Sequence, residues 1–171
     1  MDIKGKLVVL LFIAILVGTC SYLYQPVSAF SISEEDIERV RNAKLSDWNG
    51  SYVQVSDFEG KIVVVDFWET WCGSCLGVFS RLQTVQEEYP EDLVVIAATP
   101  GWRDTAINVR TFRNANDFDF VFVEARKLAS EIRLPSIPLK IIFDRNGNFV
   151  KYQAGATGTE DKDLKELIAT L

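Results

Sequence analysis

The chain has 171 residues, of which 48% are hydrophobic and 25% charged, as in a globular protein with one ordinary domain and a leader. A formal net charge of −6 and the lack of a basic tract argue against a nucleic-acid partner. There is no histidine, and only two of the three cysteines, Cys72 and Cys75, lie beyond the leader, so we expect neither a metal nor another cofactor.

Residues 1–29 have the pattern of an export leader. Lys4 and Lys6 precede an unbroken apolar run of 11 residues at positions 7–17, and small residues follow within positions 27–29. A basic start, an apolar run and a small-x-small ending together predict a secretory signal peptide.

Two alternatives remain open for this leader. An uncleaved membrane anchor fits because residues 7–24 form a stretch of 18, just long enough to span a bilayer. Lipidation of Cys20 is the other alternative, since residues 17–20 loosely resemble a bacterial lipobox. All three options export the rest of the chain. We therefore expect it in the periplasm or on the outer face of the cytoplasmic membrane.

The elements after the leader begin with a helical extension at residues 30–44. Ser33 and the acids after it are typical of a helix start. Asn49-Gly50 then stands between two strand-like pieces of residues 48–55, which is the strongest short signal for a hairpin. A turn at 56–61 leads to an apolar strand at 62–67, of the kind buried on both faces of a sheet.

Strands and helices alternate through the remainder. The expected elements are a helix that follows the cysteines and ends at Tyr89-Pro90, a strand at 93–98, a helix at 104–114 with Ile107 and Phe112 inward, a strand at 120–123, a helix at 125–132, antiparallel strands at 139–143 and 149–153, and a closing helix with Leu164, Leu167, Ile168 and Leu171 inward. This order predicts an α/β fold, with a central mixed sheet flanked by helices and an added N-terminal hairpin. Residues 45–171 form this domain.

Two cysteines stand at the junction of the strand at 62–67 and the following helix. Cys-x-x-Cys beside a strand–helix pattern is typical of a thiol–disulfide redox site. The first cysteine meets the positive end of the helix dipole, which lowers the pKa of a thiol there. We therefore predict that Cys72 is the nucleophile and that the more buried Cys75 resolves the mixed disulfide.

Asp66 and Pro138 are further candidates for the site. Asp66 precedes Cys72 by six residues, and it can take a proton from Cys75 if burial raises the carboxyl pKa. The alternative is a structural acid that accepts a backbone hydrogen bond. A cis Ile137–Pro138 bond would leave the Ile137 backbone free to pair with an extended substrate. Pro135 is the structural alternative, a helix stop.

These residues carry a resemblance to a known family. The run Val65-Asp66-Phe67-Trp68-Glu69-Thr70-Trp71-Cys72-Gly73-Ser74-Cys75, with Ser136-Ile137-Pro138 about 60 residues on, resembles the thioredoxin superfamily. Residues 55–61, the leader and the longer middle section are similar to its extracytoplasmic branch, the TlpA/ResA-like thiol–disulfide oxidoreductases. The resemblance covers about residues 45–170.

The resemblance also implies roles for individual residues. Cys72 matches the attacking cysteine, Cys75 the resolving cysteine and Pro138 the cis-proline, while Asp66 matches the buried acid of cytosolic thioredoxins. The residues expected to contact substrate are Trp71, Gly73, Ser74, Ile137 and Pro138.

Three positions depart from the family pattern. The branch often has a glutamate where this chain has Val78, and proline is usual where it has Ser74. Cytosolic thioredoxins place a lysine near the buried acid from the next strand, and residues 93–98 contain none.

The function expected from these features is thiol–disulfide exchange on exported proteins by a monomeric enzyme. The resemblance implies a reductase that is recharged by a thiol-type membrane electron donor, with apocytochrome c as the substrate class. One alternative is an oxidase or isomerase on the same fold, and another is a binding module whose disulfide is structural. No Thr-x-x-Cys peroxidatic pattern is present.

Overall fold

The computed structural model describes residues 31–171, so the predictions for the leader, Cys20 included, lie outside the described residues. Within these residues, no helix combines the length and the apolar character that crossing a membrane requires. The elements in chain order are α2 (Glu34–Asn42), β1 (Leu45–Ser46), β2 (Tyr52–Val53), the 3₁₀ helix η1 (Val55–Phe58), β3 (Ile62–Phe67), α3 (Gly73–Glu88), β4 (Leu93–Thr99), α4 (Ala106–Ala115), β5 (Val121–Glu124), α5 (Arg126–Glu131), β6 (Leu139–Phe143), β7 (Phe149–Ala154) and α6 (Glu160–Thr170).

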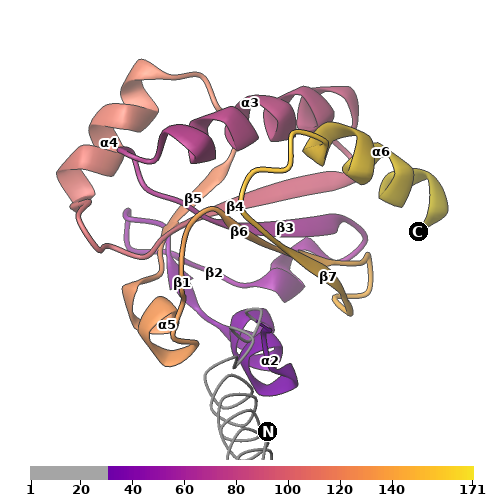
Figure 1. Ribbon diagram of the computed structural model, residues 1–171, viewed down its shortest axis with the longest axis horizontal. Coiled ribbons are helices and arrows are strands. Elements are labelled where there is room, and N and C mark those ends of the chain that lie inside the picture. The colour runs from indigo at the N-terminus through magenta and orange to yellow at the C-terminus, as the bar shows by residue number, and fades with distance from the viewer. Residues whose placement is uncertain (1–30) are drawn as a thin grey trace, which may run out of the picture. The chain divides into compact units, whose positions relative to one another are not determined.

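These strands form one mixed sheet in the order β2-β1-β5-β4-β3-β6-β7 (Figure 1). β3, β4 and β5 are parallel, as the strand–helix alternation predicts. β6 runs antiparallel to β3, and β7 pairs antiparallel with β6. The predicted α/β fold with a mixed sheet and helices on its faces is confirmed.

The N-terminal hairpin forms where Asn49-Gly50 predicts it. β1 and β2 pair antiparallel, and the carboxylate of Asp47 accepts hydrogen bonds from the amides of Asn49 and Ser51, both at 2.9 Å. Gly50 has a φ of 97°, in the left-handed region that glycine adopts at no steric cost. The next segment begins as the short 3₁₀ helix η1, where the sequence predicts only a turn.

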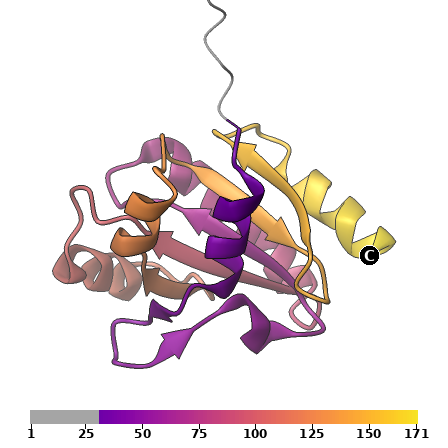
Figure 2. The same cartoon turned by 90° about the horizontal axis from the view of Figure 1, so that it is seen from below.

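Helices cover both faces of the sheet. α3, α4 and α6 lie on one face, while α2 and α5 lie on the other (Figures 1 and 2). All six residues of β3 are buried, because this strand has neighbours on both sides and helices on both faces. Side chains alternate along a strand, so Val64, Asp66 and Trp68 point to one face. Val64 and Trp68 pack with residues of α3, which identifies this face.

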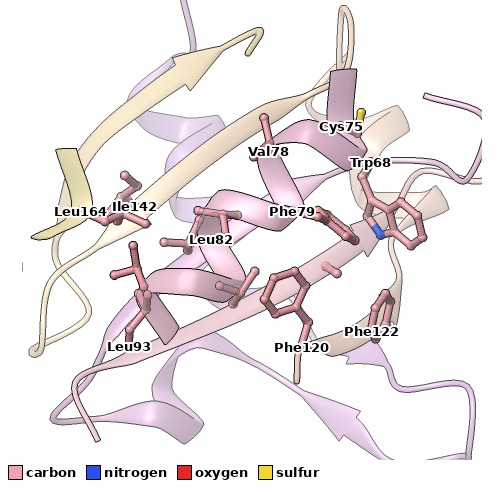
Figure 3. Close-up of a cluster of buried hydrophobic side chains, with 14 of the residues drawn as sticks. Trp68, Cys75, Val78, Phe79, Leu82, Leu93, Phe120, Phe122, Ile142 and Leu164 are labelled. Carbon is pink, nitrogen blue, oxygen red and sulfur yellow. The ribbon is translucent and has the colours of Figure 1, made fainter. Parts of the chain in front are cut away.

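An aromatic cluster fills the layer between α3 and the sheet (Figure 3). The ring of the fully buried Trp68 lies 4.6 Å from Phe79, 4.8 Å from Phe112 and 5.6 Å from Phe122, measured between centroids. Burial of large apolar side chains contributes about 1.5–3 kcal/mol each, so this layer firmly anchors the strand that leads to the cysteines.

Two inward positions of the sequence prediction are wrong. Ile107 is 74% exposed, and Val109 is the buried residue of α4. The face of α4 that carries Val109 and Phe112 packs against the core, so Ile107 points to solvent. Leu171 is exposed because it lies past the last residue of α6.

Candidate active site

The cysteine pair lies at the turn between β3 and α3. Cys72 is the N-cap residue of α3, and it forms a disulfide with Cys75 in the first turn. Cys72 keeps 6% of its surface exposed, whereas Cys75 is fully buried, as the sequence predicts. The amide of Cys75 donates to the Cys72 Sγ at 3.2 Å, and the Ser74 hydroxyl lies 3.5 Å from that sulfur. These polar groups and the helix N-terminus favour a thiolate on Cys72.

The sheet brings the Ile137–Pro138 segment to the same edge. The bond before Pro138 is cis, as predicted, and β6 pairs with β3 so that Leu139 lies opposite Phe67. The Pro138 carbonyl accepts a hydrogen bond from the Gly155 amide at 2.8 Å. Within residues 31–171, no hydrogen bond involves the backbone of Ile137, which leaves its amide and carbonyl open to a substrate strand.

Asp66 is fully buried on the sheet face that α3 covers. Among the described residues, neither of its carboxylate oxygens has a hydrogen-bond partner, so the predicted alternative of a backbone hydrogen bond is not observed. Burial raises the pKa of Asp66 to about 8, with Lys140 opposing and Glu160 adding to the rise. A carboxyl of this kind is protonated at neutral pH and exchanges its proton near the pH at which thiols ionise.

A buried lysine lies next to this acid, on the adjacent strand β6. Lys140 is the register partner of Asp66 in the β3–β6 pair, so both side chains project from the same face. Its Nζ donates to the Gly155 carbonyl at 2.6 Å and to the Glu160 Oε1 at 3.2 Å. The lysine that cytosolic thioredoxins place on the strand corresponding to residues 93–98 is absent there, and β6 supplies one instead.

The carboxylate of Glu160 accepts hydrogen bonds from both Lys140 and Arg81. Arg81 Nε donates to its Oε2 at 2.6 Å, and the amide of Thr157 donates to its Oε1 at 2.8 Å. Burial opposes ionisation of Glu160, but these hydrogen bonds and the Lys140 charge prevail and lower its pKa to about 2. The carboxylate is therefore ionised and holds Lys140 in place beside Asp66.

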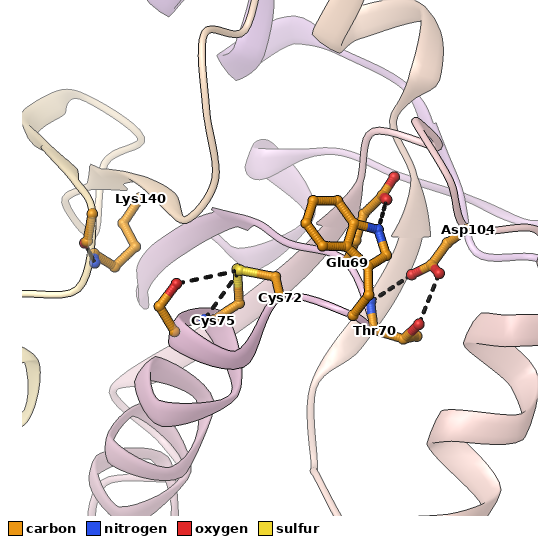
Figure 4. The surroundings of a disulfide bond; sticks show 9 residues. Glu69, Thr70, Cys72, Cys75, Asp104 and Lys140 are labelled. Atoms are coloured by element: carbon orange, nitrogen blue, oxygen red, sulfur yellow. Dashed lines mark hydrogen bonds between the residues drawn. A yellow bond between two sulfur atoms is a disulfide. The ribbon is translucent and has the colours of Figure 1, made fainter.

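Two buried carboxylates join the turn before Cys72 to the loop after β4, and we call this pair the Glu69–Asp104 clamp (Figure 4). Glu69 Oε1 accepts hydrogen bonds from the amides of Trp102 at 2.5 Å and Arg103 at 3.2 Å, and its Oε2 accepts one from the Trp71 indole. The Asp104 carboxylate accepts hydrogen bonds from the amide and the hydroxyl of Thr70, at 2.5 and 2.7 Å. Each segment thus anchors the other.

The clamp gives a testable effect on stability. Glu69→Gln places an amide NH₂ where an acceptor faces backbone N–H donors, and the charge that strengthens these hydrogen bonds is lost. We expect the free energy of unfolding to fall by about 2 kcal/mol, measured by urea titration of the oxidised protein.

Glu87→Gln is the matched control for this variant. Glu87 is exposed and accepts a single side-chain hydrogen bond, from Gln83 at 2.8 Å, so its replacement is expected to change stability by less than about 0.5 kcal/mol. Equal values for the two variants would show that the clamp contributes no stability.

The sequence pattern does not predict a role for Glu69 or Asp104 at the site. Glu69 lies within the quoted motif, but an acid in a turn has no periodic pattern that shows whether it is buried. The sequence pattern places Asp104 in the following helix, but this helix begins two residues later, at Ala106. The contact of Asp104 with Thr70 joins residues 34 positions apart, which only the adjacent parallel strands β3 and β4 bring together.

A Cys-x-x-Cys disulfide at a helix N-terminus, with a cis-proline directly before the neighbouring strand β6, defines a thioredoxin-like thiol–disulfide oxidoreductase. Residues 37–156 match the AhpC/TSA family, and the chain belongs to that family. The resemblance to the thioredoxin superfamily is confirmed, and the chain is an enzyme of the thiol–disulfide oxidoreductase class.

Individual relatives agree with this class. Thioredoxin-like protein YneN of Bacillus subtilis (strain 168) is 24% identical over 158 residues, which cover 91% of this chain and 93% of the relative. Thiol-disulfide oxidoreductase ResA of the same strain is 26% identical over 147 residues, covering 82% and 81%. The crystal structure of the exposed lipoprotein thioredoxin Etrx1 from Streptococcus pneumoniae strain TIGR4 superposes with a TM-score of 0.62 at 23% identity, covering 75% of this chain and 98% of that one.

Proposed function

We propose that this protein reduces disulfides of exported proteins through Cys72 and Cys75. The observation that carries the proposal is the unequal burial of the two cysteines at the start of α3, with the enclosed Cys75 on the face where Asp66 is buried. Such an arrangement gives one accessible nucleophile and one protected thiol that acts second.

The reaction proceeds in two exchanges. The Cys72 thiolate attacks one sulfur of the substrate disulfide, and the other substrate sulfur leaves as a thiolate that takes a proton from solvent. Cys75 then loses its proton and attacks the Cys72 sulfur, which releases the second substrate thiol. Two electrons pass from the dithiol to the substrate, and the Cys72–Cys75 disulfide remains.

Asp66 serves the second exchange in this proposal. Burial raises the pKa of this carboxyl to about 8, so the carboxylate that forms near that pH is basic enough to accept the Cys75 proton. The groups proposed to contact the substrate are the exposed Trp71, Gly73 and Ser74, the partly buried Ile137 and the buried Pro138.

The proposal includes a compartment and partners. Residues 1–29 act as a signal peptide or anchor, residues 30–44 as a helical extension, and residues 45–171 as the catalytic domain, working as a monomer outside the cytoplasm. The name of one relative, an exposed lipoprotein thioredoxin, supports an extracytoplasmic location. A thiol-type membrane donor regenerates the dithiol, and apocytochrome c is the proposed substrate class.

One observation favours the opposite direction, an oxidase. The Cys75 amide and the Ser74 hydroxyl both lie within hydrogen-bonding distance of the Cys72 sulfur, and donors of this kind stabilise the reduced thiolate. A more stable reduced form raises the reduction potential and makes the disulfide a stronger oxidant.

Redox titration of the purified domain against glutathione or dithiothreitol decides between the two directions. For a reductase we expect a reduction potential nearer the roughly −270 mV of reducing thioredoxins than the roughly −120 mV of strongly oxidising relatives. A reduction potential near roughly −120 mV would assign the protein to disulfide formation.

A further inference from the structure

Two tryptophans lie exposed beside the cysteine pair. Trp71 is 45% exposed and directly precedes Cys72, and Trp102 is 46% exposed on the loop after β4. By contrast, Trp68 is fully buried. Large exposed aromatic side chains close to a reactive site mark surfaces that a partner covers.

The Glu69–Asp104 clamp holds both tryptophans in place. The buried carboxylate of Glu69 binds the Trp71 indole N–H and the Trp102 backbone amide together. The Trp71 side chain and the backbone at Trp102 are therefore already ordered, so they lose little conformational entropy when a ligand binds.

Arg103 adds a positive charge to the same surface. Its guanidinium carbon lies 4.9 Å from the centroid of the Trp71 ring, in a cation–π contact. Among residues 31–171, no carboxylate forms an ion pair with this guanidinium, and the nearby Glu69 and Asp104 accept hydrogen bonds from other groups of the two segments. Its N–H donors therefore remain available to an acidic group on a ligand, on a protein whose net charge is −6.

The reaction at Cys72 determines which part of a substrate lies over this surface. A mixed disulfide holds the two cysteine Cα atoms about 5–6 Å apart, so the substrate residues that flank its cysteine must lie against the neighbours of Cys72. The large exposed side chain next to Cys72 in the chain is Trp71, Arg103 lies over its ring, and Trp102 directly precedes Arg103.

We propose that Trp71, Trp102 and Arg103 form a docking surface for the polypeptide that flanks a substrate cysteine, and that this surface selects an aromatic residue together with an acidic one. The indole rings bind the aromatic side chain, and the guanidinium binds the carboxylate. The inference rests on the proposed function, since it names the substrate feature that the Cys72 site accepts.

Disulfide peptides of equal length test this selection. Three peptides differ only in the two residues beside the cysteine, which are Trp-Glu, Trp-Lys or Ala-Gln. The rate constant for each peptide with the reduced protein is divided by that for bis(2-hydroxyethyl) disulfide, which has no flanking residues. We expect this ratio to be about tenfold higher for Trp-Glu than for Ala-Gln with the native protein.

Two variants and one control separate the contributions. Trp102→Ala is expected to remove most of the advantage of Trp-Glu over Ala-Gln, and Arg103→Glu to make Trp-Lys the better of the two Trp peptides. Tyr52→Ala removes a more exposed aromatic side chain, at 69%, from the outermost strand β2, and is expected to keep the native ranking. The same ranking of peptides in all four proteins would overturn the docking surface.

A binding measurement separates this inference from the proposed function. Titration of the oxidised protein with peptides whose cysteines are replaced by serine, followed by tryptophan fluorescence, requires no redox chemistry. Tighter binding of the Trp-Glu peptide, lost in Trp102→Ala, supports the docking surface, and equal binding of all peptides contradicts it. Failure of the reduced protein to reduce bis(2-hydroxyethyl) disulfide would instead contradict the proposed function.

Discussion

Cys72→Ser is expected to abolish the reduction of protein disulfides, lowering kcat/KM by more than about 1,000-fold. A serine hydroxyl does not ionise at the pH at which a thiol at a helix N-terminus does, and it forms no mixed disulfide. The assay is the turbidity of insulin during dithiothreitol-driven reduction. A native rate in the variant would mean that the disulfide of this pair is structural.

Cys75→Ser is the matched variant, because it replaces the sulfur of the second cysteine with oxygen in the same way. It keeps the attacking thiol but lacks the resolving one, so we expect a mixed disulfide between Cys72 and the substrate to accumulate. Mass spectrometry of the trapped complex identifies it. Trapping by Cys72→Ser in place of Cys75→Ser would reverse the roles assigned to the two cysteines.

Asp66→Asn is expected to stabilise the oxidised protein at neutral and alkaline pH. Burial raises the pKa of this carboxyl from 3.8 to about 8. Below about pH 4 the group is protonated in both the folded and the unfolded chain, so ionisation contributes nothing. Between about pH 4 and pH 8 the unfolded chain ionises Asp66 and the folded protein does not, so stability falls as the pH rises.

The size of this effect follows from the width of that pH window. One pKa unit corresponds to about 1.4 kcal/mol, so the rise from 3.8 to about 8 means that the buried acid costs up to about 6 kcal/mol above pH 8. Urea titrations at pH 5 and pH 9 should show the native protein losing stability across this range and Asp66→Asn losing much less. Asp117→Asn, at an exposed site, should follow the native curve. A native-like fall in the Asp66→Asn variant would assign the pH dependence to other groups.

The same substitution tests the proton transfer from Cys75. An amide cannot accept that proton, so Asp66→Asn should slow resolution of the mixed disulfide and remove the rise of its rate with pH near pH 8, the pKa of the native carboxyl. Stopped-flow mixing of the reduced protein with a disulfide peptide measures this step. An unchanged pH profile would restrict Asp66 to an effect on stability.

Local sequence patterns determined the elements and the chemistry of this protein. Asn49-Gly50 predicts the hairpin because its backbone suits a tight turn, and the apolar run at 62–67 predicts a strand buried on both faces. Cys72 and Cys75 define the redox pair because their spacing and helix position are local properties. Ile137–Pro138 is likewise visible in the sequence, although its position beside the cysteines follows from the β3–β6 pairing.

The tertiary structure alone decided the groups around the cysteines. Lys140 lies opposite Asp66 because β6 pairs antiparallel with β3 in one register, and the Glu69–Asp104 clamp forms because β3 and β4 end at the same edge of the sheet. Hydrophobic periodicity specifies which face of an element is buried, but it carries no information on which polar side chains of distant segments meet. The partners of the buried acids, and the exposed surface they hold beside Cys72, follow only from strand order and register.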